Sequence, residues 1–323
     1  MKSEGDHPDV AAVAGQGWDP GEMLAVTFAK FGEPSVLELT TMADPHAGPG
    51  QVRIAVRAAG VNPFDWKLRA GYFRDAFRTE FPAIPGIEAA GVVDEVGEGV
   101  QGISPGDAVF GLGARAYAEL AVLDHFAVKP AVLSWAQAGG LAVAAETAVR
   151  VLEIIRPAAG QTLLIEGAAG AVGSTAAQIA RAAGVTVIGT ASESNLEFLR
   201  SLGVLATTYG PGLPGRVAAL APGGVDAVFD TSGRGSLRQL IEIAGSPGSV
   251  VTIADFSAAE HGAQVTSRTQ AFHALPEAAR LAGEGKLIPA IDSEFPLAAA
   301  AKAQQRSQAG HVRGKIVLLV PGA

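Results

Sequence analysis

The chain has 323 residues, no cysteine, and a formal net charge of −8 from 24 basic and 32 acidic residues. The lack of cysteine excludes disulfides, thiolate metal sites and cysteine nucleophiles. The acidic balance argues against a nucleic-acid partner, which needs a basic face. No apolar run approaches the ~18 residues of a membrane span. We therefore expect a cytoplasmic protein without membrane contact, large enough for about two domains.

The first third of the chain has the pattern of a β-domain. Residues 1–22 are polar, rich in Gly and Pro, and predicted to be a disordered tail. From Met23 to about Pro130, short apolar runs alternate with turn signals such as the segments GPGQ and SPGD. This pattern predicts a compact, partly open β-barrel over residues 23–130.

The pattern changes near Ser134. A helix over 134–155 is followed by an alternation of short apolar strands and helices that ends with a strand over 249–254. Such alternation is typical of a parallel, doubly wound sheet. We predict an α/β chain whose second domain spans residues 131–270, while residues 271–323 return to the first domain and complete it.

A glycine-rich turn follows the first strand of this series. The strand TLLIE runs into GAAGAVG and then into an Ala-rich helix. Such a turn lets the main chain approach a pyrophosphate and points the positive end of the helix toward it. Ala168 stands where the G-x-G-x-x-G motif has its first glycine, so the motif is imperfect. The predicted phosphate-binding residues are Gly167, Gly170, Ala171, Val172 and Gly173.

The end of the next strand bears on the choice of dinucleotide. NAD sites usually place an acidic residue there to bind the ribose, whereas this strand ends at Thr190 and Ala191. Ser192 and Asn195 can donate hydrogen bonds to a 2′-phosphate, and Tyr209 can flank the adenosine. These residues favour NADPH over NADH, although Glu193 stays open as a ribose ligand and the loop contains no lysine or arginine.

Several segments occur together in a characteristic order: FGEPSVLEL, GPGQVRIAVRAAGVNPFDWKLRAG, FPAIPGIEAAGVVDEVGEGV, GDAVFG, AYAELAV, ETAVRVLE, LLIEGAAGAVGSTAAQIA, VIGTAS and GHVRGKIVLLV. Over about residues 23–320 the chain resembles the medium-chain dehydrogenase/reductase superfamily, in its zinc-independent quinone oxidoreductase and enoyl reductase branch. The resemblance implies a GroES-like barrel, a Rossmann domain, and an active site in the cleft between them. It also implies a homodimer, for which 262–267 is a candidate edge segment.

Two departures from the zinc-dependent members concern the metal. Those members carry Cys where this chain has Asn62, and His where it has Ile87, so the resemblance implies an enzyme without zinc. Glu88 is retained, and we expect it to hold the barrel together. Without a metal, hydride addition to a conjugated C=C is the less demanding reaction, because the charge spreads into an enolate that hydrogen-bond donors can stabilise.

The sequence therefore predicts an NADPH-dependent reductase of a small hydrophobic enone, enoyl ester or quinone. The high content of Ala and Gly hints at a GC-rich bacterial source, in which such reductases serve secondary metabolism. The alternatives are a zinc-free carbonyl reductase or alcohol dehydrogenase, and a non-catalytic NADPH-binding redox sensor.

The resemblance places residues 60–67 beside the nicotinamide. The catalytic candidates are Asn62 as a donor to a carbonyl, Lys67 as a partner of the carboxamide or enolate, and Tyr72 as a proton donor. Asn62 is equally well interpreted as a turn residue, and Lys67 as an exposed lysine. Phe64 and Trp66 are the candidate walls of an apolar substrate pocket.

Other candidates lie in the second domain and at the C-terminus. Thr147 belongs to the ETA segment, which approaches the nicotinamide in relatives, and the neighbouring Glu146 has no evident role. Residues after the fourth and fifth strands are expected at the ligand-binding edge of the sheet; they are Thr231, Ser232, Ala254 and Phe256. His311, Arg313 and Lys315 can approach the cofactor from the C-terminal segment, but their interpretation as surface charges is favoured.

Overall fold

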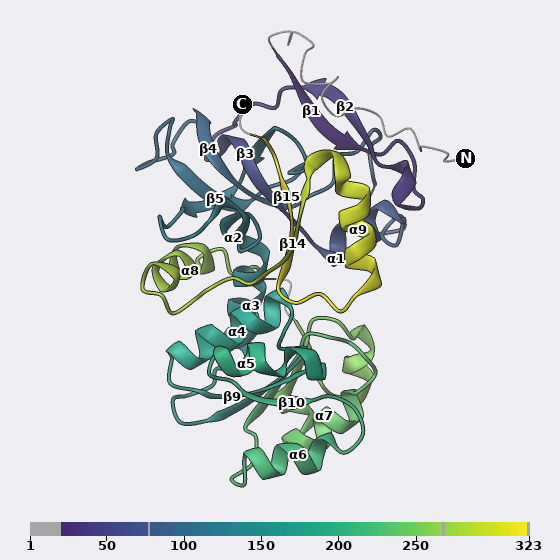
Figure 1. The fold of residues 1–323 in the computed structure, drawn as a ribbon, viewed down its shortest axis with the longest axis vertical. Helices are drawn as coiled ribbons and strands as arrows, with labels where there is room; N and C mark the ends of the chain where they lie inside the picture. The colour runs from purple at the N-terminus through teal and green to yellow at the C-terminus, as the bar shows by residue number, and fades with distance from the viewer. Residues whose placement is uncertain (1–20, 77, 267–268, 322–323) are drawn as a thin grey trace, which may run out of the picture.

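A computed structural model describes residues 21–76, 78–266 and 269–321. The predicted tail lies outside the described residues except for its last two positions. Two sheets organise the rest of the chain, one in each half of the molecule (Figure 1). Among the helices within the described ranges, none has the length and apolar character needed to cross a membrane.

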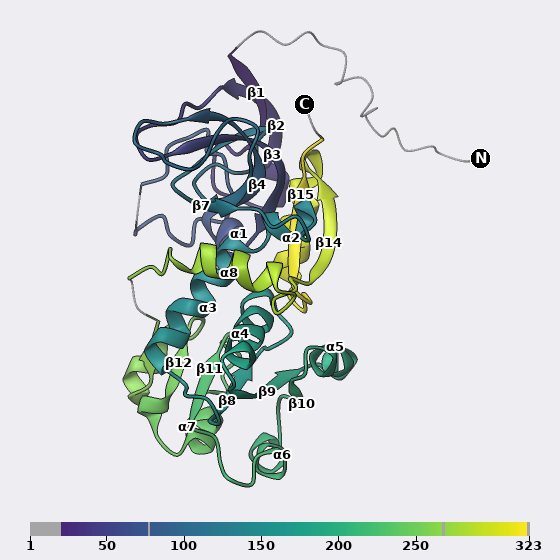
Figure 2. The ribbon, with the colours of Figure 1, turned by 90° about the vertical axis from the view of Figure 1, so that its left-hand side faces the viewer.

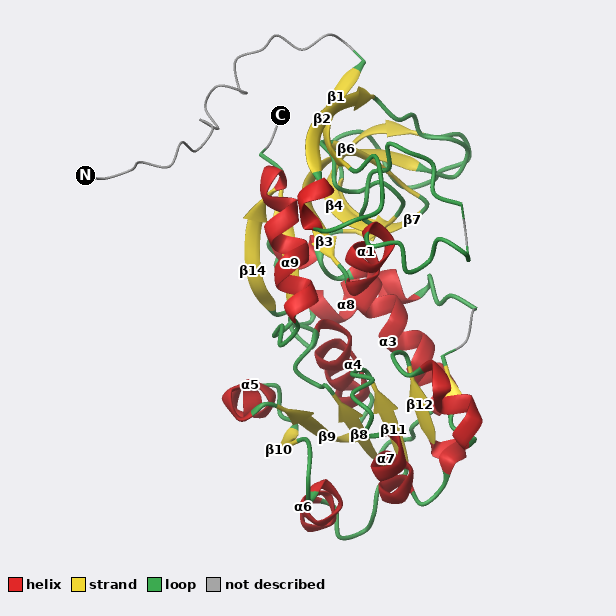
Figure 3. Ribbon diagram, turned by 90° about the vertical axis from the view of Figure 1, so that its right-hand side faces the viewer, coloured by secondary structure: helices red, strands yellow, loops and turns green. Residues whose placement is uncertain are grey.

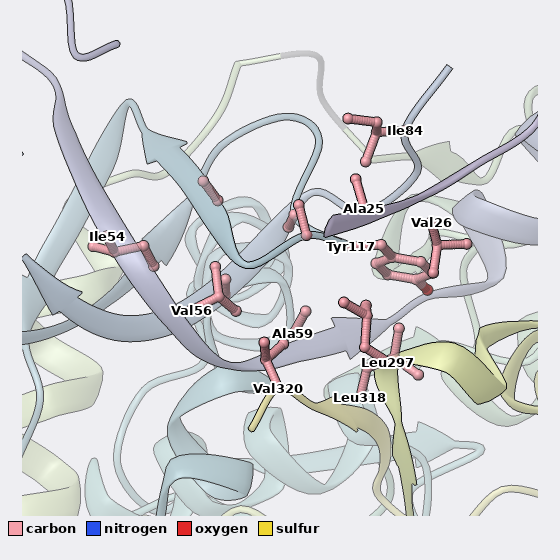
Figure 4. Close-up of a cluster of buried hydrophobic side chains, with 14 of the residues drawn as sticks. Ala25, Val26, Ile54, Val56, Ala59, Ile84, Tyr117, Leu297, Leu318 and Val320 are labelled. Atoms are coloured by element: carbon pink, nitrogen blue, oxygen red, sulfur yellow. The ribbon is translucent and has the colours of Figure 1, made fainter. Parts of the chain in front are cut away.

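The first half is built on a seven-stranded, mainly antiparallel sheet. Its order is β14-β15-β3-β4-β5-β7, with β6 paired to β3, and the hairpin β1-β2 packs beside it. The strands are β1 (Glu22–Thr27), β2 (Glu38–Ala43), β3 (Val52–Val61), β4 (Glu88–Val96), β5 (Ala108–Leu112), β6 (Leu120–Leu123), β7 (His125–Val128), β14 (Ile291–Pro296) and β15 (Lys315–Leu319). Buried and half-buried residues alternate over the first six residues of β3, as expected for a strand with one face on a core, and its last four residues are all buried. That core includes Ile54, Val56 and Leu318, with Tyr117 among them (Figure 4).

The chain returns to this sheet at its end. β15 pairs antiparallel with β3, Ile316 opposite Val61, and β14 pairs parallel with β15. Figure 1 shows both C-terminal strands, in yellow, beside the N-terminal strands. The domain boundaries at 130 and 270 stay a prediction.

The second half is a parallel six-stranded sheet with the order β10-β9-β8-β11-β12-β13 (Figure 2). Its elements are β8 (Thr162–Glu166), α4 (Ala171–Ala182), β9 (Thr186–Ala191), α5 (Leu196–Ser201), β10 (Leu205–Thr208), α6 (Leu213–Leu220), β11 (Ala227–Asp230), α7 (Leu237–Ala244), β12 (Val250–Thr252) and β13 (Gln264–Val265). The connection direction reverses at β8, which lies between β9 and β11. Ligands of such sheets bind outside the carboxyl ends of the strands at this switch point.

The predicted helix over 134–155 is two helices, α2 (Trp135–Gly139) and α3 (Ala142–Ile155). The break lies at two glycines that pack closely on the first sheet. A Cβ on Gly139 would lie 2.6 Å from the Ala58 carbonyl oxygen, and one on Gly140 would lie 2.5 Å from Lys315 Cγ. This tight approach holds the break between the two helices against β3 and β15.

The remaining helices are α1 (Pro63–Arg69), α8 (Ala274–Gly283) and α9 (Ala300–Ala309). Short 3-10 segments occur at Pro34–Val36, Glu193–Asn195, Pro247–Ser249, Phe256–His261 and Leu297–Ala299. Figure 3 shows α3, α4 and α8 in the middle of the molecule, between the two sheets. A site at the carboxyl edge of the parallel sheet therefore faces the first half of the chain.

Candidate active site

The glycine-rich turn sits at the switch point, directly after β8. Gly167 has φ +77°, which a glycine adopts without strain. A Cβ at Gly173 would lie 2.6 Å from the Gly167 carbonyl oxygen, so turn and helix pack in direct contact. A Cβ at Gly170 would meet only that oxygen, at 3.5 Å. The turn is closed at both ends and open beside Gly170.

This geometry fits a pyrophosphate. The first main-chain N–H groups of the 12-residue helix α4, those of Ala171, Val172 and Gly173, have no intrahelical acceptor. Together with the helix dipole they favour an anion in the open space beside Gly170. The residues predicted from the sequence to bind phosphates are therefore brought together in one cradle.

Two predicted cofactor residues, Thr190 and Thr231, form hydrogen bonds to the main chain at the start of the turn. Thr190 is fully buried, and its hydroxyl oxygen accepts the Gly167 N–H at 3.2 Å. The Thr231 hydroxyl donates to the carbonyl oxygens of Glu166 at 2.7 Å and Gly167 at 3.2 Å. Both side chains thus fix the conformation of the turn.

The loop after β11 is held by a buried carboxyl pair. Asp230 Oδ1 accepts the main-chain N–H groups of Ser232, at 2.8 Å, and Gly233, at 3.0 Å. Burial, together with the neighbouring charge of Asp230, raises the pKa of Glu166. After β12, the Ala254 N–H donates to Thr252 Oγ1 at 3.1 Å, and Phe256 is 75% exposed.

Two arginines lie in the region expected to hold the adenosine: Arg313, which the sequence analysis considered, and Arg234, which it missed. Asn195 Nδ2 donates to Ser192 Oγ at 3.1 Å. The Arg313 guanidinium lies 5.6 Å from the ring centre of Phe198, three residues after Asn195. The Arg234 guanidinium lies 5.2 Å from the ring centre of Tyr209. Arg234 follows Tyr209 by 25 residues, so local spacing gave no signal for that contact.

Asn62 belongs to a buried polar cluster between the end of β3 and the start of α1. Its Oδ1 accepts from Lys315 Nζ at 2.6 Å, and its Nδ2 donates to Glu88 Oε1 at 2.9 Å. Glu88 Oε2 accepts the Val143 N–H at the start of α3, at 2.8 Å. Lys315, interpreted from the sequence as a surface charge, is only 5% exposed. That interpretation is wrong because the Glu88 carboxylate and the Asn62 carbonyl satisfy the ammonium inside the protein.

A second carboxylate fixes the backbone of the same segment. Asp65 Oδ2 accepts the Asn62 N–H at 2.7 Å, which caps α1, and the Tyr117 hydroxyl at 3.0 Å. Burial raises the pKa of Asp65 to about 7, despite these hydrogen bonds and the nearby Lys315. Asp65 therefore orients the loop that carries Asn62.

The C-terminal strand connects the two groups of residues. The Gly314 N–H donates to the Ala169 carbonyl oxygen in the glycine-rich turn, at 2.8 Å. The next residue, Lys315, bonds Asn62. The phosphate cradle and the Asn62 cluster are thus tied to each other through two consecutive residues.

The predicted aromatic residues gather around α1. The rings of Trp66 and Tyr72 meet edge to face with centres 5.6 Å apart, and Lys67 Nζ lies 5.6 Å from the Trp66 ring centre. The rings of Phe64 and Phe73 stack at 5.1 Å. Tyr72 is 70% exposed. These contacts form an apolar, partly open surface next to Asn62.

Glu146, which had no evident role in the sequence, joins α3 to the segment before α8 through an ion pair and hydrogen bonds. Its carboxylate accepts from Arg150 Nε at 2.8 Å, from the Thr147 hydroxyl at 3.2 Å and from the Ala271 N–H at 3.0 Å. Arg150 also contacts the Thr266 hydroxyl at 2.5 Å. These contacts fix Thr147, which follows Val143 by one helical turn of α3.

Replacing Glu146 by leucine is expected to lower the free energy of unfolding by about 3 kcal/mol, because the Arg150 guanidinium loses the charge of the Glu146 carboxylate while it stays largely buried. The double replacement Glu146→Leu with Arg150→Met should recover most of that loss. Urea unfolding of the three variants checks this. Equal losses in the single and double variants would contradict the assignment of a coupled pair.

Among residues 21–76, 78–266 and 269–321, no three His, Asp or Glu side chains gather closely enough to hold a metal ion. The positions of Asn62 and Ile87, where zinc-dependent members carry Cys and His, offer no thiolate or imidazole.

Comparison with known proteins agrees with this geometry. Residues 48–149 match the family model "Alcohol dehydrogenase GroES-like domain", and residues 214–318 match "Zinc-binding dehydrogenase". The chain is 32% identical over 319 residues to an Arabidopsis thaliana protein named NADPH-dependent alkenal/one oxidoreductase, chloroplastic, covering 93% of this chain and 80% of the relative.

Two further similarities are of the same kind. A 2-methylene-furan-3-one reductase of Solanum lycopersicum is 35% identical over 250 residues, which cover 72% of this chain but only 63% of the relative. The solved structure of the quinone oxidoreductase from Coxiella burnetii superposes with a TM-score of 0.82 at 31% identity, covering 93% of this chain and all of that one. The predicted combination of a GroES-like barrel and a Rossmann domain is confirmed. The chain belongs to the medium-chain dehydrogenase/reductase family, among relatives that are quinone oxidoreductases and enone reductases.

Proposed function

We propose that the protein is an NADPH-dependent reductase that transfers a hydride to an activated C=C or to a quinone, without zinc. The observation that carries the proposal is the junction at β15. Gly314 bonds the turn that fits a pyrophosphate, and Lys315 bonds Asn62, so a cofactor held at the turn and a carbonyl held near Asn62 would contact neighbouring groups of the protein. The printed names of the relatives, an alkenal/one oxidoreductase and a furanone reductase, support a conjugated carbonyl as the acceptor.

The proposed reaction gives a separate task to each of the candidate residues. A bound NADPH supplies the hydride, which adds to the β-carbon of the acceptor. The Asn62 amide is placed to donate a hydrogen bond to the carbonyl oxygen, where negative charge develops. A proton from Tyr72 or from water then adds to the α-carbon, so that the C=C becomes a single bond. Phe64 and Trp66 provide an apolar wall that excludes water from the acceptor.

The absence of zinc is part of the proposal. Asn62 and Ile87 replace the Cys and His that the zinc-dependent members carry, and the Asn62 amide provides a neutral donor instead of a Lewis acid. We expect chelators such as EDTA to leave turnover unchanged.

The preference for NADPH is attributed to Ser192, Asn195 and Arg313. Replacing Arg313 by alanine is expected to weaken NADPH binding about tenfold, because one charge-assisted contact to the 2′-phosphate is lost. NADH binding should change less than twofold, since NADH lacks that phosphate. Cofactor fluorescence titrations measure both constants. An equal loss for both cofactors would contradict the role of Arg313.

NADPH oxidation with three acceptors tests the proposal: an enone, a quinone and a simple saturated ketone. The proposal requires turnover of the enone or the quinone in preference to the ketone. Preferential turnover of the ketone would indicate a carbonyl reductase instead. A melting-temperature shift with NADPH but no turnover of any acceptor would indicate a nucleotide-binding sensor.

A further inference from the structure

The Asn62 side chain has two polar ends of similar shape, and its neighbours distinguish between them. A lysine ammonium only donates hydrogen bonds, and a carboxylate only accepts them. Lys315 Nζ lies 2.6 Å from Asn62 Oδ1, and Glu88 Oε1 lies 2.9 Å from Asn62 Nδ2. The reversed amide would place its NH₂ group against an ammonium and its oxygen against a carboxylate. Only one orientation of the amide therefore satisfies both neighbours.

The two neighbours are themselves held in place. Glu88 is fully buried, contacts Lys315 and accepts the Val143 N–H at 2.8 Å. Room for both side chains depends on glycines: a Cβ on Gly60 would overlap the Glu88 carboxylate, and one on Gly140 would lie 2.5 Å from Lys315 Cγ. The Glu88 and Lys315 side chains are thus tightly packed and do not adapt easily to a reversed amide.

The orientation leaves one amide hydrogen available. Asn62 Nδ2 carries two hydrogens, and one of them bonds Glu88. Within the part of the chain that the structure describes, no acceptor is found for the other. A buried N–H without a partner is costly, so this hydrogen favours an acceptor oxygen supplied by a ligand.

We propose that Lys315 and Glu88 are positioning residues that fix the Asn62 amide so that its second N–H is offered to a carbonyl oxygen of a bound ligand. The identity of that ligand rests on the proposed function. The carbonyl belongs either to the acceptor molecule or to the carboxamide of the nicotinamide, and the two sources predict different binding data. The orientation itself is a property of the free protein and is tested without any ligand.

The chain makes this test unusually direct because it contains only two asparagines, Asn62 and Asn195. Asparagine-selective ¹⁵N labelling of the full chain gives two side-chain NH₂ groups in an NMR spectrum. Asn195 is half-buried at the end of the 3-10 segment Glu193–Asn195 and serves as an internal control. In the free protein we expect the two Asn62 protons to differ strongly in chemical shift and to exchange slowly with water. Lys315→Met and Glu88→Gln should each reduce that separation and speed the exchange at least tenfold.

A matched control perturbs the same C-terminal segment outside the cluster. Arg306→Met breaks an ion pair in which Nη2 lies 3.0 Å from Asp292 Oδ1, and it should leave the Asn62 signals unchanged. Asn62 signals that stay unchanged in both Lys315→Met and Glu88→Gln would overturn the inference. Melting curves of each variant show that the signals come from folded protein.

Kinetics then identify the source of the carbonyl. Lys315→Met and Glu88→Gln are each expected to weaken, by 10- to 100-fold, whichever step uses the Asn62 N–H: turnover of the acceptor or binding of NADPH. If the carbonyl belongs to the acceptor, kcat/KM for an enone falls while the Kd of NADPH alone is unchanged. If it belongs to the carboxamide, the Kd of NADPH rises. Changes below twofold in both constants would overturn the inference, whereas a wild type that reduces no conjugated acceptor would contradict only the proposed function.

Discussion

Replacing Gly173 by alanine is expected to abolish cofactor binding and to destabilise the protein. The added Cβ would lie 2.6 Å from the Gly167 carbonyl oxygen and 2.7 Å from Ala168 Cα, both of which are backbone atoms. Since backbone cannot rotate away as a side chain does, helix α4 must shift from the turn. We expect a loss of about 2–3 kcal/mol in the free energy of unfolding. The Kd of NADPH should rise at least ~100-fold.

Gly170→Ala is the matched variant that separates the cradle from the fold. Gly170 has φ −73° and ψ 171°, which alanine adopts without strain, and its Cβ would meet only one oxygen at 3.5 Å. Stability should therefore be unchanged or rise by up to about 1 kcal/mol. The same Cβ would occupy the space assigned to a phosphate, so affinity for NADPH should fall about 10- to 100-fold. Unchanged affinity in a stable Gly170→Ala protein would contradict the placement of the pyrophosphate.

The second large effect concerns Asp65 and pH. Burial raises the pKa of Asp65 to about 7, whereas the unfolded chain has the ordinary value of 3.8. The folded protein thus keeps a proton that the unfolded chain releases from about pH 4 upward. This contribution is fully present at low pH and is lost as the pH rises through about 7. We expect it to amount to about 4 kcal/mol across that range.

Asp65→Asn should remove this dependence, because an amide imitates the protonated carboxyl and cannot ionise. Its oxygen can still accept the Asn62 N–H and the Tyr117 hydroxyl, as Asp65 Oδ2 does. In urea unfolding between pH 5 and 8, the free energy of unfolding of Asp65→Asn should rise relative to that of the wild type as the pH rises. Tyr117→Phe loses a hydrogen bond that lowers the pKa of Asp65, so in this variant the pH range over which stability is lost should extend to higher pH. Parallel curves for wild type and Asp65→Asn would contradict the buried protonated state.

The parts of the molecule that depend on short-range patterns were predictable from the sequence. The strand, turn and helix around Gly167–Gly173 follow one another along the chain, and the structure has them at β8 and α4. The break between α2 and α3 was not predictable, because it depends on contacts of Gly139 and Gly140 with β3 and β15. A continuous helical pattern carries no record of such distant neighbours.

The polar cluster illustrates the same limit. Asn62 and Glu88 are 26 residues apart, and Lys315 follows Asn62 by 253. A lysine is exposed in most proteins, so its burial becomes evident only when β15 is seen beside β3. Glu146 could not be explained from the sequence because one of its partners is a main-chain N–H, that of Ala271, 125 residues away. Because every residue except proline has a main-chain N–H, the residue type does not indicate which of them will donate to a distant side chain.

The central claim is that the hydride is transferred to the β-carbon of a conjugated carbonyl. It is tested most directly by turnover of an α,β-unsaturated ketone with NADPH deuterated at C4 of the nicotinamide, followed by mass spectrometry and NMR of the product. The proposal predicts a saturated ketone with deuterium on the β-carbon and a solvent proton on the α-carbon. An allylic alcohol with deuterium on the former carbonyl carbon would contradict it.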